Sequence, residues 1–142
     1  MVATTKLDLF AGIPVTSFAE ARKWYEQLFG SPPAFFPHST EAVWKLAQHR
    51  YVYIVEQREH AGHAQVTIFV EDLDARVAGI RERGLKSSKR ESYPNAVRKI
   101  SYRDADGNEV GFGGSRKRRT NRSPRSVRGP RSPIRPARER GR

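Results

Sequence analysis

The sequence predicts an α+β fold in which two βαβββ modules form a cupped mixed sheet, followed by a disordered basic C-terminal tail. The order strand, helix, three strands occurs twice along the chain, at an offset of 55 residues. With 142 residues the chain is long enough for one hydrophobic core. All 14 aromatic residues lie at or before Phe112, so the core must be built before the tail begins. We therefore expect one domain over residues 1–114, with modules at about 5–57 and 64–114, and a tail over residues 115–142.

The first module is predicted to open with a strand over Leu7–Val15 and a helix over residues 18–29. Ser17 and Glu20 have the spacing of a capping box, in which the serine side chain accepts a hydrogen bond at the helix N-terminus. Apolar residues then recur at intervals of three and four, and Gly30 supplies the left-handed conformation in which many helices end. Short segments rich in aromatic and branched residues predict three further strands, over residues 34–36, 42–48 and 50–56.

The second module repeats this order. The offset places Val15 on Val70 and Ser17 on Asp72, so Asp72 is expected to begin the second helix. Gly84 is expected to close that helix. The remaining pattern predicts strands over residues 65–70, 86–93, 96–103 and 109–112, with a tight turn at 104–108 between the last two.

Three landmarks in this order resemble the vicinal oxygen chelate superfamily, the group of the glyoxalases, bleomycin-resistance proteins and extradiol dioxygenases. They are the opening segment Leu7–Tyr25, the second start Gln65–Ala75 and the closing segment Tyr102–Phe112. The resemblance spans about residues 5–114. It implies paired βαβββ modules whose strands form a cup, with a divalent metal held by the first strand of each module and by the final strand. Such a metal takes imidazole or carboxylate ligands and leaves positions open for two substrate oxygens.

The positions that the resemblance implies for those ligands carry no complete ligand set. They fall on Phe10, Gln65 and Gly111, of which only the Gln65 amide oxygen could coordinate a cation. Glu56, at the end of the first module, is a weaker candidate. Glu109 is another, because a register shift of two residues would keep it on the same face of its strand. We therefore expect no metal cofactor, and a bound divalent metal is the alternative.

An aromatic side chain at position 10 would make the centre of the cup apolar, which suits a planar or hydrophobic small molecule. No catalytic residue is evident. We predict ligand binding by residues expected to share one sheet face: Phe10, Trp44, Tyr53, Gln65 and Tyr102. Filling the core between sheet and helix explains Trp44, Tyr53 and Tyr102 equally well.

Two other function classes stay open because a fold alone does not fix a function. One is a divalent-metal-dependent lyase, isomerase or dioxygenase of the same superfamily, and the other is a purely structural module. The resemblance also implies that a homodimer can complete or cover the cup.

Charge separates the tail from the domain. The chain has a net charge of +12, but residues 115–142 hold 12 Lys and Arg against one acid, whereas residues 1–114 hold 15 against 14. The tail could be attracted to nucleic acid through phosphates alone, because no aromatic residue lies between its arginines to stack on bases. The alternative is an unselected extension.

The chain has no cysteine, which excludes disulfides, thiolate metal sites and a cysteine nucleophile. Nowhere do 18 apolar residues follow one another, and the N-terminus lacks a basic-then-apolar leader. We therefore expect a cytoplasmic protein without a membrane span.

Overall fold

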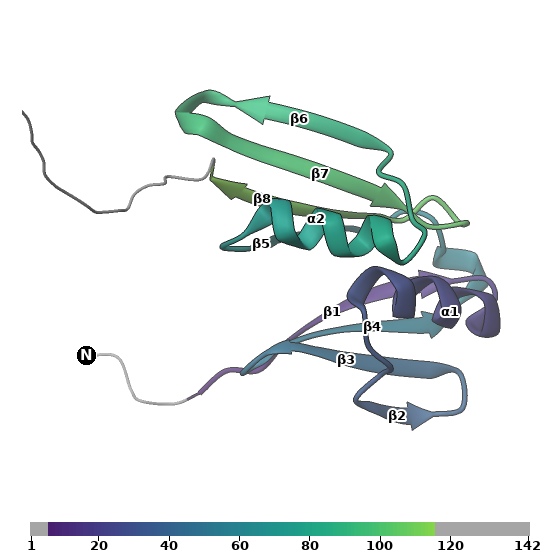
Figure 1. The fold of residues 1–142 in the computed structure, drawn as a ribbon. Helices are drawn as coiled ribbons and strands as arrows, with labels where there is room; N and C mark the ends of the chain where they lie inside the picture. Colours follow the sequence, from purple (N-terminus) through teal and green to yellow (C-terminus); the bar gives the residue numbers. More distant parts are fainter. Residues whose placement is uncertain (1–5, 116–142) are drawn as a thin grey trace, which may run out of the picture.

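The structure is a computed structural model that describes residues 6–115 (Figure 1). Residues 116–142, which hold almost all of the predicted tail, lie outside the described range, so nucleic-acid binding through that tail stays a prediction. Within residues 6–115, no helix combines the length and the apolar character needed to cross a bilayer. The predicted α+β fold is confirmed: each half of the domain is one strand, one helix and three further strands.

The first module packs one helix on a four-stranded mixed sheet of order β1-β4-β3-β2. β1 runs parallel to β4, and the other neighbouring pairs are antiparallel. Its elements are β1 (Leu9–Val15), α1 (Phe18–Phe29), β2 (Phe35–His38), β3 (Glu41–Ala47) and β4 (Arg50–Glu56). α1 and β4 have the predicted bounds, and the other strands differ from the prediction by one or two residues at their ends.

The second module repeats this arrangement in its own sheet, of order β5-β8-β7-β6, with β5 parallel to β8. Its elements are β5 (Gln65–Phe69), α2 (Leu73–Glu82), β6 (Lys89–Tyr93), β7 (Val97–Arg103) and β8 (Glu109–Ser115). Two short 3₁₀ helices were not predicted: η1 (Arg58–His60) connects the modules, and η2 (Pro94–Ala96) separates β6 from β7. The repeat therefore gives two separate four-stranded sheets (Figure 1).

Both helices begin where the capping residues predict. The Ser17 hydroxyl accepts a hydrogen bond from the Glu20 amide at 3.3 Å, and the Asp72 carboxylate accepts one from the Ala75 amide at 3.0 Å. Each bond satisfies one of the amides that a helix leaves unpaired at its N-terminus. These matching caps place the two helices at equivalent positions in the two modules.

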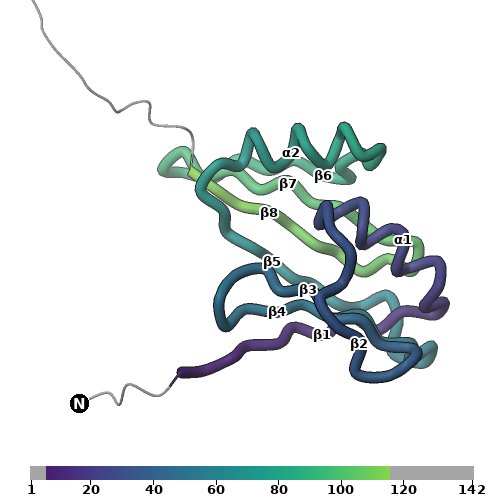
Figure 2. Tube along the Cα trace, turned by 60° about the horizontal axis from the view of Figure 1, so that its bottom comes forward, coloured from purple at the N-terminus to yellow at the C-terminus, as the bar shows by residue number. Residues whose placement is uncertain are grey.

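Each helix covers one face of its own sheet (Figure 2). In the first module, the rings of Tyr25 and Phe29 on α1 lie 6.2 Å and 5.5 Å from the ring of Trp44 on β3. In the second, the Arg76 guanidinium on α2 lies 5.6 Å from the ring of Phe112 on β8. Buried residues of both modules join in one core cluster on this side. We call the opposite side, which no helix of residues 6–115 covers, the open face of each sheet.

The predicted turn between β7 and β8 docks the second module onto the first. Both oxygens of the Asp106 carboxylate accept hydrogen bonds from Thr16, at 3.0 Å from its amide and 2.7 Å from its hydroxyl. The buried hydroxyl of Tyr25 donates to Asp104 at 2.8 Å. β1 and β5 belong to different sheets and share no backbone hydrogen bonds. These side-chain hydrogen bonds therefore connect the two modules.

Asn108 uses its whole hydrogen-bonding capacity at this junction while it is fully buried. Its amide nitrogen donates to the Pro14 carbonyl at 2.8 Å and to Asp104 at 2.9 Å. Its amide oxygen accepts from the backbone amides of Gly62 at 3.1 Å and Ala64 at 2.9 Å. One side chain thus binds β1, the connection between the modules and its own turn.

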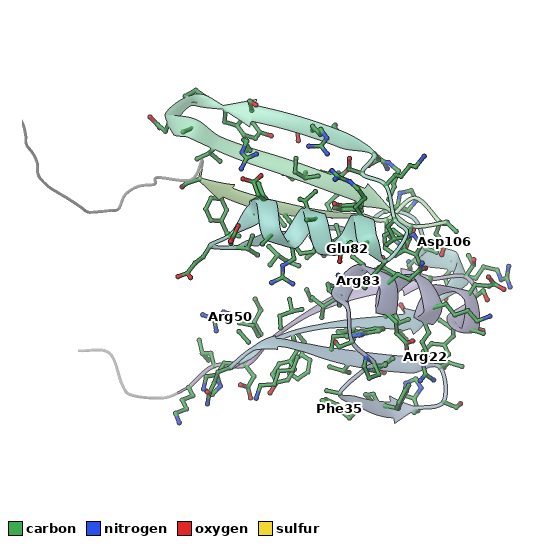
Figure 3. All side chains as sticks on the ribbon, viewed as in Figure 1. Arg22, Phe35, Arg50, Glu82, Arg83 and Asp106 are labelled. Atoms are coloured by element: carbon green, nitrogen blue, oxygen red, sulfur yellow. The ribbon has the colours of Figure 1, made fainter. Side chains whose placement is uncertain are left out.

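A second junction lies at the C-terminal ends of the helices. The Arg83 guanidinium donates to the carbonyls of Gln27 and, at 3.1 Å, Leu28, while the Gln27 side chain donates to the Arg83 carbonyl at 2.8 Å. A cation is favourable here because the last carbonyls of a helix carry partial negative charge. Arg83 and Asp106 both lie where the two modules meet in Figure 3.

Asn108→Asp tests the first junction. The substitution replaces two donors by an acceptor beside Asp104 and the Pro14 carbonyl, so the free energy of unfolding should fall by about 3–5 kcal/mol. Urea denaturation of both proteins measures the change. Asn95→Asp makes the same chemical change at an exposed position and should shift stability by less than about 0.5 kcal/mol. Equal losses in the two variants would contradict the role of Asn108.

Tyr25→Phe tests the bond to Asp104 and gives a pH signature. Burial, together with the adjacent Asp104 carboxylate, raises the pKa of Tyr25. The unfolded chain therefore releases this proton near pH 10 while the folded chain retains it, and stability falls as the pH rises above about 10 by up to about 1.4 kcal/mol per unit. Tyr25→Phe should cost about 1–2 kcal/mol at pH 7 and remove that share of the alkaline slope. Denaturation series from pH 7 to 11 measure both, and an unchanged slope would contradict the assignment.

Candidate functional site

Three aromatic rings form a row across the open face of the first sheet. Phe10 on β1 stacks on Tyr51 on β4 with ring centroids 4.5 Å apart and planes 9° from parallel. Phe35 on β2 meets the same tyrosine edge-on, at 6.5 Å and 70°. We call Phe10, Tyr51 and Phe35 the aromatic row; Phe35 is labelled in Figure 3.

Strand register explains why these residues meet. Phe10 lies opposite Tyr51 in the parallel β1–β4 pair, and Phe35 lies opposite Val43, the β3 residue that pairs with Tyr53. Residues two apart on a strand share a face, so Tyr51 and Tyr53 point the same way. Phe10 and Phe35 remain 46% and 45% exposed, which is a large fraction for aromatic side chains on a folded domain.

Tyr53 extends this aromatic surface because β1 has no side chain beneath it. A Cβ added at Gly12 would lie 2.5 Å from the hydroxyl-bearing carbon of the Tyr53 ring, so the ring lies directly over the glycine backbone. Val43 lies under the same surface and is only 1% exposed. Lys45, opposite Tyr51 on β3, places an exposed cation at the border of the row.

The open face of the second sheet is polar where the resemblance implies the other ligand positions. Gln65 on β5 lies opposite Glu109 on β8, and Glu109 is 9% exposed and accepts a hydrogen bond from Arg103 at 3.2 Å. Gly111 lies beneath the side chain of Lys99, since an added Cβ would come 2.6 Å from its Cε.

The remaining acidic candidate is used by a helix. A Glu56 oxygen accepts a hydrogen bond at 3.0 Å from the amide of Phe18, the first residue of α1. The carboxylate therefore lies at the positive end of the helix dipole. Glu56 is thus directed to the helix-covered side and not to the open face that bears Phe10.

The side chains present do not fit a divalent metal. Phe10 and Gly111 offer no donor, Gln65 offers a single amide oxygen, and the nearest acid, Glu109, is paired with Arg103. Among residues 6–115, no group of three or more histidine or acidic side chains could hold a metal ion. A protein site for such an ion needs several imidazole or carboxylate ligands together.

The five predicted ligand-binding residues do not come together. Phe10 and Tyr53 share the open face of the first sheet, and Gln65 lies on the open face of the second. Trp44 and Tyr102 lie on the helix-covered side, each 1% exposed, and the Trp44 indole nitrogen donates to the Ser31 carbonyl at 2.9 Å. The sequence reasoning placed Trp44 and Tyr102 on the wrong side of their sheets relative to Phe10, because their facing depends on register partners, Val52 and Val110, that lie in the core.

Two residues of the aromatic row, Tyr51 and Phe35, were not predicted. One signal for Tyr51 was available, since it stands two positions from Tyr53 on a strand whose bounds were predicted. No such signal existed for Phe35, because Phe35 and Phe36 are adjacent and point to opposite faces. Phe36 lies under the Arg22 guanidinium of α1 at 4.8 Å.

Comparison with known proteins agrees with the arrangement of the fold. The family profile described as Glyoxalase/Bleomycin resistance protein/Dioxygenase superfamily matches residues 6–112. A solved glyoxalase/bleomycin resistance protein from Catenulispora acidiphila DSM 44928 is 53% identical, with 77% of this chain and 98% of that chain covered and a TM-score of 0.75. A search of curated proteins gave no match.

Two more distant structures share the fold. TnmS3, an antibiotic binding protein from Streptomyces sp. CB03234, is 20% identical over 80% of this chain and 99% of that chain, with a TM-score of 0.60. Lactoylglutathione lyase from Agrobacterium tumefaciens is 15% identical over 79% of this chain and 96% of that chain, with a TM-score of 0.63. The profile match and the 53% identity confirm the resemblance found in the sequence. The chain belongs to the glyoxalase/bleomycin resistance protein/dioxygenase superfamily.

Proposed function

We propose that this protein acts in the cytoplasm by binding a planar aromatic small molecule on the aromatic row, without a metal ion. The observation that carries the proposal is the stacked pair of Phe10 and Tyr51, with ring planes 9° from parallel, on a face that neither described helix covers. The Phe10 ring of this stacked pair is 46% exposed and leaves apolar surface on which a ligand ring can pack. The antibiotic binding protein TnmS3, which has the same fold, supports binding as a function of this architecture.

The energetics favour a ring-shaped ligand over an aliphatic one. An aromatic pair contributes about 0.5–1.5 kcal/mol beyond the area it buries when the rings stack with an offset or meet edge-on. Phe10 and Phe35 are each nearly half exposed, so a ligand that covers them also removes apolar area from water. Lys45 beside Tyr51 would favour an acidic group at the edge of such a ligand.

The metal-dependent alternative has one observation in its favour, the position of Glu109 opposite Gln65 on one open face. Against it, the Glu109 carboxylate is paired with Arg103, and Glu56 caps α1. Two oxygen ligands of which one is neutral would bind a divalent cation weakly. The metal-free binder therefore accounts for more of the described side chains.

A second copy of the chain is the proposed cover for the open faces. Besides the aromatic row, Phe69 on the open face of the second sheet is 63% exposed, with its ring over Gly113. Apolar side chains gathered on uncovered sheet faces are typical of surfaces that bind a partner. A dimer that set the second sheet of one copy against the first sheet of the other would enclose the aromatic row in a cup.

Phe10→Ala and Phe35→Ala test the binding site. The probe is anthraquinone-2-sulfonate, a planar anion, and isothermal titration calorimetry gives its Kd. Each substitution should weaken binding about tenfold, the equivalent of one lost aromatic contact. Phe36→Ala is the matched control, because Phe36 is 44% exposed but faces α1, and it should leave Kd unchanged.

The same titration separates the two functions. Binding should be unaffected by excess EDTA or by added Mn²⁺, Ni²⁺ or Zn²⁺, since the proposed site uses no metal. Loss of binding in EDTA would contradict the metal-free site, and equal effects of Phe35→Ala and Phe36→Ala would contradict the aromatic row.

Sedimentation equilibrium tests the dimer. The measured molar mass of the full chain should be twice the 16.2 kDa of one copy. Phe69→Lys introduces a charge into the proposed interface and should shift the equilibrium to the monomer, because an unpaired charge is costly to bury. A monomeric parent protein at micromolar concentration would refute the proposal.

A further inference from the structure

A pocket lies on the helix-covered side of the second sheet, away from the open face that bears the aromatic row. It has a volume of about 360 Å³, within the range of small-molecule sites. Its apolar floor consists of Val77 on α2, Leu85 after that helix and the ring of Tyr102 on β7. Tyr102 is held in place by an edge-on contact with Phe112, at 6.1 Å and 72°. The pocket thus has a fixed apolar floor at the core of the module.

Three cations surround this floor. Arg81 on α2, Lys86 in the following loop and Arg90 on β6 line the pocket, and none of its lining residues is acidic. Their side chains make no hydrogen bond or ion pair with any other residue in the described range 6–115. The C-terminal dipole of α2 favours the charge of Arg81, which lies in the last turn of that helix. It does not account for Lys86 and Arg90, which lie beyond the helix.

The Tyr102 hydroxyl adds a hydrogen-bond donor to the same pocket. Burial raises the pKa of Tyr102, and the guanidinium charges of Arg90, Arg81 and Arg83 oppose that rise. The hydroxyl therefore keeps its proton at neutral pH. It has no hydrogen-bond partner among residues 6–115, whereas the buried hydroxyl of Tyr25 has one in Asp104. The Tyr102 hydroxyl is not one of the fully buried side-chain atoms that lack a partner in the described range, so it is accessible from the pocket and can donate a hydrogen bond to a ligand there.

We propose that this pocket binds a small carboxylate whose apolar body rests on Val77, Leu85 and Tyr102 while its charge is held by Arg81, Lys86 and Arg90. Guanidinium groups bind carboxylates through paired charged hydrogen bonds, and the tyrosine hydroxyl provides one more donor. The apolar floor selects for an organic body, since a bare inorganic anion would leave it uncovered. The site is independent of the proposed function because it belongs to the other module and the other side of its sheet.

The test uses the full chain and three probes that separate charge from shape. Cyclohexanecarboxylate carries both features, cyclohexanecarboxamide has nearly the same shape without the charge, and inorganic phosphate has charge without an apolar body. Methyl resonances of Val77 and Leu85 in ¹H–¹³C spectra report occupancy. The carboxylate should shift them saturably, the amide should bind at least tenfold more weakly, and phosphate should not shift them. Equal binding of the amide or of phosphate would overturn the proposal.

Matched variants show whether the pocket or the general positive charge of the chain binds the probe. Arg81→Ala/Arg90→Ala should weaken carboxylate binding at least tenfold, and Tyr102→Phe about threefold. Lys23→Ala/Arg58→Ala removes two exposed positive charges elsewhere and should leave binding as it is. If the double pocket variant unfolds, the exposed Lys86→Ala alone should still weaken binding about threefold. Equal losses in pocket and control variants would overturn the proposal, and Phe10→Ala should have no effect on this site.

Discussion

The docking of the 104–108 turn onto the first module is the constraint on which the rest of the structure depends. The two sheets share no strand pairing, so their relative placement rests on the core between the helices and on a few buried polar contacts. Asp106 fixes the end of β1 through Thr16, and Asn108 fixes the Pro14 carbonyl and the start of β5. Buried polar groups of this kind are stabilising only when every partner is present, which is the case for Asn108.

This junction also decides which side of each sheet is left open. Tyr25 projects from α1 to reach Asp104, and Arg83 at the end of α2 binds the last carbonyls of α1, so both helices are held on one side. Strand alternation then sends the intervening residues to the other side. Phe10 and Phe35 are exposed for that reason, and Tyr51 between them is partly exposed. The aromatic row lies on the face of the first sheet opposite the one that α1 covers.

The sequence predicted the helices well because their signals are local. Ser17 and Asp72 act within the first turn of the helices that they cap, and Gly30 acts at the end of α1. The predicted bounds of α1 are the observed ones. The strands were found for the same reason, but their facing depends on register across the sheet. Trp44 and Tyr53 were therefore placed on one face when they lie on opposite ones.

The two proposed binding regions differ in how far a sequence can reveal them. Part of the aromatic row follows from alternation along one strand, once the position of Phe10 is known from the repeat. The basic pocket does not, because Arg81, Lys86 and Arg90 come from a helix, a loop and a strand that only tertiary packing brings together. In the sequence Arg81 is followed by Glu82 and Arg90 by Glu91, so the local charge pattern did not indicate a cluster of cations.

The contacts that stabilise the fold and the positions where the resemblance implies metal ligands lie on different faces of the sheets. The family fold can therefore persist with other residues at those positions. The helix caps, the core and the 104–108 turn all lie on the helix-covered side or at the module junction, and none of them uses Phe10, Gln65 or Gly111. A phenyl ring at position 10 or a glycine hydrogen at position 111, where the resemblance implies metal ligands, therefore leaves the interactions that hold the fold unchanged. In the proposed function such a change affects only the ligand that the open face binds, because stacking surface takes the place of coordinating atoms.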